Sequence, residues 1–514
     1  MFKKRFLAVL LAAICIIGFG VAAQADQIDG LTNRTAAQVQ PTGLNLYVNP
    51  GGLGDALIYG YYNARNSWDF IRVINTSTTS GVAAKVRFRE GDDSNEVLDF
   101  FICLSAGDQW SAWIIGDNNT ANPAQLFWYD NDTPTYPDPQ GNNNATDNMM
   151  AIVPLHYSAS GAAAAVSAND TKEGYFEIIG VNSWPDTPGA TKLIDTPNEC
   201  ASQLGLLAPI VGPPAIPAAG TADVPNVLAG NTYIFNIGDG AGTYAYNATA
   251  LANFVMVPIA GAGLATDDPP RLNNSTDISV AGSDGAGTGI DEVNYVLTKG
   301  VEYFMYDIET LLAGGTDLIE TFPTKRLTIS ASLGNAVPIA LNGPFNDRAC
   351  IATDNSIGTS AAADGTGVCS TTVTARDETT NGRCEFIRVT IFDDAENSPT
   401  TTTGFSPGET ATLVKCKEVN VITVGTGASL LNTALLEFNL NTTGFELGWI
   451  GINLEQNAAA ANRTTYIDTT VLGPGAGDAT AVGLPVIAYE LQGFLDGYYT
   501  QMLPARYRVT ITNP

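Results

Sequence analysis

Apolar and polar residues alternate over short stretches along most of the chain, a pattern typical of β-strands. The clearest example is 84–90, where Lys85, Arg87 and Arg89 fall on one face and apolar side chains fall on the other. This division predicts an antiparallel strand with one buried face and one solvated face. Similar runs predict strands over 44–48, 56–62, 70–74, 97–104, 175–181, 233–237, 386–392, 419–424 and 507–512.

Helical periodicity is scarce, and only 248–256 and 301–312 predict short helices. Gly, Asn, Asp and Pro separate the strand-like runs, as expected for turns between antiparallel strands. We therefore expect an all-β protein. It should contain two or more antiparallel β-sandwich-like domains, with long Gly/Asn/Asp/Thr-rich loops and few short helices.

Two irregular segments suggest where the chain divides. Residues 205–225 are rich in Pro and Ala, which predicts a linker or a long crossing loop. Residues 333–383 are rich in Gly, Ala, Thr, Asn and Asp, although strands on the two sides of this segment can share a sheet. The predicted domains are an N-terminal sandwich (26–204), a middle β-rich domain (226–335) and a C-terminal sandwich with disulfide-bearing loops (336–514).

One short sequence recurs: Phe-Ile-Arg-Val at 70–73 is found again at 386–389. Both copies lie in strand-like runs. Four matching residues fit a duplicated domain or a chance similarity between two strands of like composition.

The N-terminus has the pattern of a secretory signal peptide. Lys3, Lys4 and Arg5 precede the apolar run 6–17, and Ala23-Gln24-Ala25 follows as the small-residue cleavage site. We expect cleavage before Asp26 and export of the mature chain. The alternative is a retained anchor over 6–23, and no other segment is apolar enough to predict a membrane-spanning helix.

Removing the signal peptide makes the chain more acidic. It leaves 21 basic and 52 acidic residues, a net charge of about −31. Such a surface repels phosphates, which argues against a nucleic-acid partner. Because charged residues are 15% of the chain and hydrophobic residues 45%, the acidity does not predict disorder.

Six cysteines remain after cleavage, an even number in an exported chain, which predicts disulfides. Six cysteines allow 15 connectivities. Proximity in the sequence favours Cys350–Cys369 and Cys384–Cys416, which leaves Cys103–Cys200.

Catalytic motifs are poorly supported. Gly404 to Gly408 has the spacing of a serine nucleophile elbow, but Pro407 follows Ser406 and lacks the N–H that the oxyanion hole requires. His156 is the only histidine, in an apolar strand-like setting that indicates a packed side chain. Carboxylate-pair catalysis on a polysaccharide stays open as an alternative, because two carboxyl groups can come from distant strands and tryptophans can stack on sugars.

Several acidic loops have the composition of calcium ligands. The segment with Asp130, Asp132 and Asp138 is the leading candidate for Ca²⁺, because Trp128 and Tyr129 beside it can anchor it to a core. Asp and Asn are also ordinary turn residues, so the alternative is a loop without metal.

Three blocks of sequence resemble a group of uncharacterised secreted β-rich proteins of Gram-negative bacteria. They are Phe-Ile-Arg-Val-Ile-Asn-Thr at 70–76, Leu-Ser-Ala-Gly-Asp-Gln-Trp at 104–110 and Thr-Phe-Pro-Thr-Lys-Arg at 321–326. The resemblance implies export and β architecture, and it implies no activity and no site residues.

These features favour an exported structural or adhesive β protein of the cell surface or extracellular space, of the surface-layer, adhesin or filament type. Its expected partners are further copies of itself, other surface proteins or glycans. The alternatives are a secreted carbohydrate-active enzyme and a periplasmic ligand-binding module.

Overall fold

The computed structural model of the chain describes residues 46–512 with internal gaps. The gaps longer than ten residues are 138–150, 155–166, 204–225, 255–271, 273–289, 326–344, 351–382, 395–410 and 468–478. The described chain is built mainly of antiparallel sheets, so the expected all-β class is confirmed. Its described helices are short: η1 (Asp170–Lys172), α3 (Pro197–Gln203) and α4 (Ile290–Leu297). None of them is long and apolar enough to cross a membrane.

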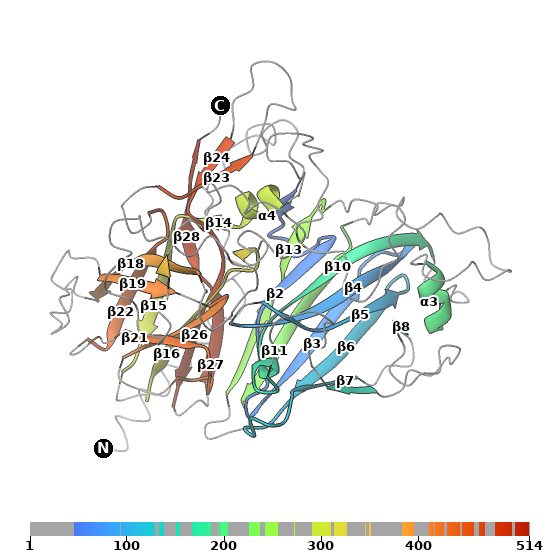
Figure 1. Cartoon of the computed structure of the whole chain (residues 1–514), viewed down its shortest axis with the longest axis horizontal. Helices are drawn as coiled ribbons and strands as arrows, with labels where there is room; N and C mark the ends of the chain where they lie inside the picture. Colours follow the sequence, from blue (N-terminus) through green and yellow to red (C-terminus); the bar gives the residue numbers. More distant parts are fainter. Residues whose placement is uncertain are drawn as a thin grey trace, which may run out of the picture.

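The first sandwich pairs a seven-stranded sheet, sheet I, with a six-stranded sheet, sheet II (Figure 1). Sheet I has the order β1 (Tyr47–Val48), β13 (Thr249–Ala252), β2 (Ala56–Asn63), β10 (Glu173–Pro185), β4 (Ser80–Glu90), β5 (Glu96–Leu104) and β8 (Thr135–Tyr136). Sheet II has the order β12 (Thr243–Asn247), β11 (Leu228–Asn236), β3 (Ser67–Asn75), β6 (Gln109–Ile115), β7 (Gln125–Trp128) and β9 (Ala151–Pro154).

The second sandwich pairs sheets III and IV, to the left of the first in Figure 1. Sheet III has the order β21 (Leu436–Leu440), β20 (Val419–Val424), β16 (Gly315–Thr321), β26 (Ile487–Phe494) and β27 (Tyr499–Pro504). Sheet IV has the order β17 (Ala349–Cys350), β18 (Arg383–Asp393), β22 (Leu447–Asn453), β15 (Val301–Asp307) and β28 (Arg506–Arg508), and β19 (Ala411–Lys415) also pairs with β18. Two small sheets complete the described fold: β14 (Thr298–Lys299) with β25 (Leu484–Pro485), and β23 (Thr464–Ile467), β24 (Ala479–Val482) and β29 (Thr510–Thr512).

The three central strands of sheet III, β20, β16 and β26, are buried on both faces and join the two sandwiches. Leu318 packs in the core of the second sandwich, whereas the next residue, Ile319, packs in the core of the first. The strand register places Ile319 opposite Val421 on β20 and Tyr489 on β26, and both of these side chains also belong to the first core. Because successive side chains of a strand point to opposite faces, one sheet can complete two cores.

Strand pairing groups the chain differently from the divisions expected near 205 and 335. Strands β11 and β13, which follow the Pro/Ala-rich segment, pair with β3 and β2 of the first sandwich. Strand β16, which precedes the second expected cut, pairs with β20 and β26 beyond it. The described strands therefore form two sandwiches, one from residues 46–254 and one from residues 298–512.

The Phe-Ile-Arg-Val repeat has a structural counterpart. Its first copy lies in β3 of sheet II and its second in β18 of sheet IV. Ile71 and Val73 point into the first core, and Ile387 and Val389 point into the second. In both copies the second and fourth residues therefore point into a core.

Both segments expected to be helical contain strands, so that prediction was wrong. Thr249–Ala252 is β13 and Val301–Asp307 is β15. In β15, Phe304 is buried while Met305 is 44% exposed, which is the two-residue period of a strand. Pairing with β22 and β28 decides the structure where the local preference is weak.

The basic face of β4 is buried, not solvated as expected. Lys85, Arg87 and Arg89 are each at most 5% exposed. Lys85 pairs with Asp99, and Arg89 Nε lies 2.5 Å from Glu177 Oε1. Burial lowers the pKa of Lys85. The alternation of charged and apolar residues correctly predicts the strand, but ion pairs with neighbouring strands allow its charged face to be covered.

The described residues contain the expected Cys103–Cys200 disulfide, which joins β5 to α3 with the two Cα atoms 5.8 Å apart. It lies among the apolar side chains of Phe101, Val181 and Trp184. The expected pairs Cys350–Cys369 and Cys384–Cys416 lie outside the described side chains.

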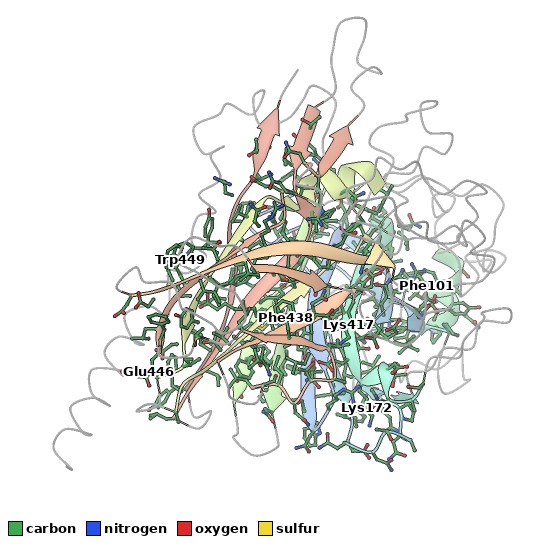
Figure 2. The ribbon with its side chains drawn as sticks, turned by 60° about the vertical axis from the view of Figure 1, so that its left-hand side comes forward. Phe101, Lys172, Lys417, Phe438, Glu446 and Trp449 are labelled. Carbon is green, nitrogen blue, oxygen red and sulfur yellow. A yellow bond between two sulfur atoms is a disulfide. The ribbon has the colours of Figure 1, made fainter. Side chains whose placement is uncertain are left out.

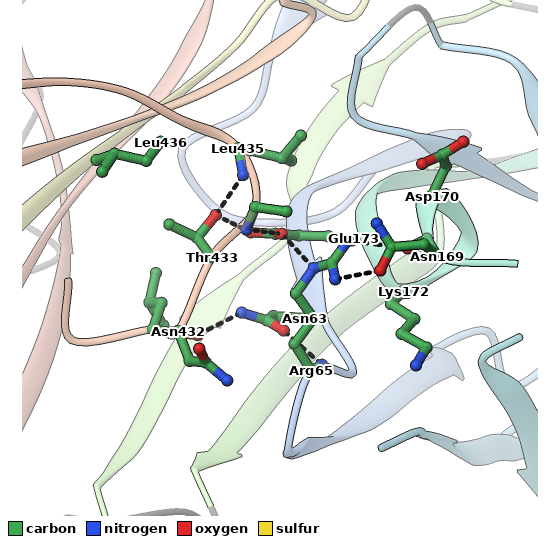
Figure 3. Close-up of polar contacts among 12 residues, drawn as sticks. Asn63, Arg65, Asn169, Asp170, Lys172, Glu173, Asn432, Thr433, Leu435 and Leu436 are labelled. Carbon is green, nitrogen blue, oxygen red and sulfur yellow. Dashed lines mark hydrogen bonds and ion pairs between the residues drawn. The ribbon is translucent and has the colours of Figure 1, made fainter. Parts of the chain in front are cut away.

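Glu173 at the start of β10 connects the two sandwiches (Figure 3). Its Oε1 accepts hydrogen bonds from the hydroxyl of Tyr61, at 2.6 Å, and from the hydroxyl of Thr433. Its Oε2 accepts from Arg65 Nε at 3.0 Å and from the backbone N–H of Ala434 at 2.9 Å. Because its side chain is 1% exposed, these contacts couple the first sandwich to the 429–435 loop of the second through a buried charge.

Candidate functional site

The outer face of sheet II carries a group of aromatic side chains. On β3 the buried Ile71 and Val73 point into the core, so Trp68 and Phe70 point outward, and Trp68 is 45% exposed. Neighbouring strands contribute rings at matching positions. We call this group the aromatic face; it comprises Trp68, Phe70, Trp113, Phe127, Tyr233 and Phe235.

The strand register arranges these rings in rows across the sheet. Phe70 lies opposite Tyr233 on β11 and opposite Trp113 on β6. The ring centroids of Phe70 and Trp113 are 4.5 Å apart, and those of Phe70 and Tyr233 are 6.4 Å apart. Trp68 lies opposite Phe235 in the adjacent row and meets Trp113 edge-on at 6.3 Å. Through Trp113 and Phe70, five of the six rings form one connected apolar surface, and Phe127 lies opposite Trp113 on β7.

Arg72 borders the aromatic face on β3. Its guanidinium carbon lies 5.1 Å from the ring centroid of Tyr233 and 5.9 Å from that of Phe70. Its Nη2 donates to the hydroxyl of Tyr233 at 2.8 Å, and its Nε donates to Asn231 Oδ1 at 3.0 Å. The fixed guanidinium gives the apolar surface one cationic, hydrogen-bonding edge.

A pocket of about 420 Å³ adjoins the aromatic face at Trp68, away from Arg72. Trp68 lines both the pocket and the aromatic face. The other lining residues are Ile115, Gly116, Asp117, Asn122, Pro123 and Gln125, which supply carboxylate and amide groups beside the indole. Ring faces next to such groups can stack on an apolar face of a ligand and bind its hydroxyls.

Asp117 is held as a carboxylate. Its Oδ2 accepts from Asn122 Nδ2 at 2.8 Å, and its Oδ1 lies 3.1 Å from Lys172 Nζ. The hydrogen bond from Asn122, followed by that from Lys172, lowers the pKa of Asp117. The carboxylate is therefore an acceptor at neutral pH, with a side chain 54% exposed.

A second aromatic group lies on the outer face of sheet IV. Trp449 on β22 is 37% exposed and stacks on Phe392 of β18 at 4.7 Å. Its ring lies 6.1 Å from that of Tyr303 on β15. Trp449 and Lys172, the partner of Asp117, lie on opposite sides of the view in Figure 2. The two outer sheets thus present separate aromatic surfaces.

The residues proposed from sequence as calcium ligands, Asp130, Asp132 and Asp138, lie outside the described residues, as do His156 and Ser406. In the part of the chain that the structure describes, no group of three or more His, Cys, Asp or Glu side chains is arranged to hold a metal ion. The calcium site stays a prediction.

The tryptophans divide into two sets, which sequence reasoning did not separate. Trp110, Trp128 and Trp184 are buried, whereas Trp68, Trp113 and Trp449 lie on outer faces. The signal was present in Ser67–Asn75: Trp68 and Phe70 have the same parity as Arg72, which marks the solvated face, while Ile71 has the parity of the core. Aromatic residues on the polar side of an amphipathic strand indicate an interaction surface.

No protein-family model, curated protein or solved structure matches this chain.

Proposed function

We propose that this protein is an exported structural or adhesive protein of the cell surface or extracellular space, and that it binds glycans through the aromatic face of sheet II. The observation that carries the proposal is the position of Trp68. Its exposed indole joins a continuous row of rings to a pocket lined by Asp117, Asn122 and Gln125.

Exposed aromatic rings in contact with one another are a feature of binding surfaces. A single exposed ring does not indicate a binding site, whereas a contiguous apolar patch with a polar border usually marks an interaction site. Trp and Tyr supply a large contact area with few rotatable bonds, so little conformational entropy is lost on binding. Packing of Trp113 against Phe70 and Phe235 restricts these rings further.

The chemistry around the face favours a glycan over other partners. The net charge of −28, which becomes about −31 if the signal peptide is cleaved, disfavours nucleic acids. A sugar offers an apolar ring face for Trp68 and hydroxyl groups for the amides and carboxylate of the pocket. The guanidinium of Arg72 adds a donor at the far edge.

An adhesive function is favoured over hydrolysis at this site. A glycosidase requires two carboxyl groups flanking the scissile bond. Of the described residues that line the pocket, Asp117 is the one carboxylate. The signal-peptide pattern of the N-terminal sequence and the Cys103–Cys200 disulfide support export, because disulfides persist in oxidising compartments.

Affinity electrophoresis tests the proposal. The mature chain is run through native gels that contain soluble polysaccharides of bacterial envelopes and of plant and fungal walls. We expect retardation by at least one polysaccharide, with loss of retardation in Trp68→Ala and normal retardation in Trp449→Ala. If every gel leaves the mobility unchanged, or if the two variants lose retardation equally, the aromatic face of sheet II is not a glycan site.

A further inference from the structure

Three ionisable side chains lie inside the second sandwich, between sheets III and IV. Lys415 is on β19 and Glu302 is on β15, both in sheet IV, and Glu320 is on β16 in sheet III. Each of them is at most 1% exposed. Lys415 Nζ contacts the carboxylate of Glu320, so the pair bridges the two sheets.

The strands direct these groups into an apolar interior. On β16, Glu320 shares its face with Leu318 and Phe322, both of which belong to the second core. Lys415 Nζ lies 6.0 Å from the ring centroid of Phe322. The neighbouring ion pair, Arg463 with Glu385 opposite Lys415, is held separately at 3.0 Å.

The Lys415–Glu320 pair lacks the support that a buried ion pair requires. Among the described residues, neither Lys415 Nζ nor either carboxylate oxygen of Glu320 has a hydrogen-bond partner, and the same is true of one oxygen of Glu302. Desolvation of two such charges costs several kcal/mol per ion unless other groups satisfy them. The neutral forms of these groups are therefore favoured in this interior.

The protonation of Lys415 and Glu302 follows from their burial. Desolvation lowers the pKa of Lys415 to about 7, although the charge of Glu302 opposes this. Desolvation likewise raises the pKa of Glu302 to about 7, opposed by the charge of Lys415. At neutral pH a large fraction of the amine is therefore an uncharged nucleophile, and a large fraction of Glu302, which interacts with it electrostatically inside the same sandwich, is a carboxylic acid.

We propose that Lys415 and Glu320 are joined by an intramolecular isopeptide bond, formed with Glu302 as the acid–base group. The lone pair of Lys415 Nζ attacks Cδ of Glu320, and the N–C bond forms as one C–O bond of the carboxyl group breaks. Glu302 gives a proton to the departing oxygen and receives one from the nitrogen, so it ends in its initial state. The amine loses one hydrogen, the acid loses OH, and one water molecule leaves. No oxidant, reductant or other reactant is needed.

The bond covalently ties sheet III to sheet IV. It replaces a buried ion pair that lacks hydrogen-bond partners with a neutral amide. It also closes a loop of about 95 residues between positions 320 and 415, which lowers the conformational entropy of the unfolded chain as a disulfide does. The inference does not depend on the proposed glycan site, since it concerns the other sandwich.

Mass spectrometry of the wild-type mature chain tests the bond directly. After denaturation and reduction, we expect an intact mass about 18 Da, or one water, below that of the sequence. Trypsin does not cleave after an acylated lysine. We therefore expect one branched peptide in which residues 300–325 are joined to residues 389–417, with fragment ions that place the branch at Glu320 and Lys415. The full sequence mass with separate linear peptides would overturn the proposal, and so would a branch at other residues.

Variants test the chemistry. Glu302→Gln is expected to lower the cross-linked fraction at least tenfold, and Lys415→Met to abolish it. Glu490→Gln is the matched control: Glu490 is another buried glutamate of the second sandwich, and it already accepts hydrogen bonds from the backbone of Met305 and from Gln492. It should keep the bond. Full cross-linking in folded Glu302→Gln would refute the acid–base role, and if a variant does not fold, the wild-type peptide still decides whether the bond exists.

Discussion

Replacement of Glu173 by alanine is the sharpest test of how the two sandwiches are coupled. The substitution removes a carboxylate that is 1% exposed and accepts hydrogen bonds from Tyr61, Arg65, Thr433 and the backbone of Ala434. It leaves Arg65 without its carboxylate and deprives the 429–435 loop of two contacts. Removing one partner of a buried charged network typically costs about 3–5 kcal/mol, and we expect a loss in this range.

Urea unfolding, followed by tryptophan fluorescence and by circular dichroism, measures the loss. We expect the two signals of the wild-type chain to change together, because sheet III completes both cores. In Glu173→Ala the transition should move to lower urea concentration. The matched control is Glu455→Ala, which breaks a 3.3 Å pair with Arg508, whose side chain is 59% exposed, and which should cost less than about 1 kcal/mol. If Glu173→Ala is no more destabilising than Glu455→Ala, the coupling through Glu173 is wrong.

The buried Glu490, the Cys103–Cys200 disulfide and the N-terminal segment can each be tested by one measurement. Burial raises the pKa of Glu490 to about 7, so the folded chain binds more protons than the unfolded chain between about pH 4.5 and 7. The stabilisation by protonated Glu490 is fully present below pH 4.5 and is lost as the pH rises to 7. Urea titrations at each pH should therefore show that the free energy of unfolding of the wild type falls by about 3 kcal/mol over this window relative to Glu490→Gln. Parallel pH profiles of the two proteins would contradict this. The double substitution Cys103→Ala with Cys200→Ala, which opens a link spanning 97 residues, should lower the free energy of unfolding by about 3–4 kcal/mol, whereas an unchanged melting temperature would show that the link adds no stability. Edman sequencing of protein exported by a bacterial host should begin at Asp26, and a chain that retains residues 6–23 in the membrane fraction would show an uncleaved anchor.

The alternation of side chains was sufficient to predict the fold class, and each of the ten predicted runs contains a described strand, but it did not predict other strands such as β6, β16, β22 and β26. It fails where both faces of a strand are covered. In β16 all positions from Thr316 to Thr321 are buried, so the sequence gives no polar face by which to orient the strand. The same cause hides the buried basic face of β4, where Lys85 and its neighbours have the polarity of a solvated surface but lie against carboxylates.

Long-range pairing explains what local patterns did not predict. The Pro/Ala-rich segment 205–225 has the composition of a domain linker, yet β11 after it pairs with β3. The aromatic face depends on register, because Trp68, Trp113 and Phe235 come from three strands separated by up to about 170 positions. A single sequence shows that each ring has outward parity, but not that the three rings meet.

Equilibrium binding of the mature chain to a polysaccharide measures how much Trp68 contributes to glycan binding at sheet II. The ligand is the polysaccharide that retards the chain most strongly in affinity electrophoresis. The bound fraction is measured as the loss of free protein from solution for the wild type, Trp68→Ala and Trp449→Ala. Loss of a stacking indole at the edge of the pocket should weaken binding about tenfold, equivalent to about 1.4 kcal/mol, while Trp449→Ala binds as the wild type does. Wild-type affinity in a folded Trp68→Ala variant, or an equal loss in both variants, would contradict the assignment of the site to sheet II.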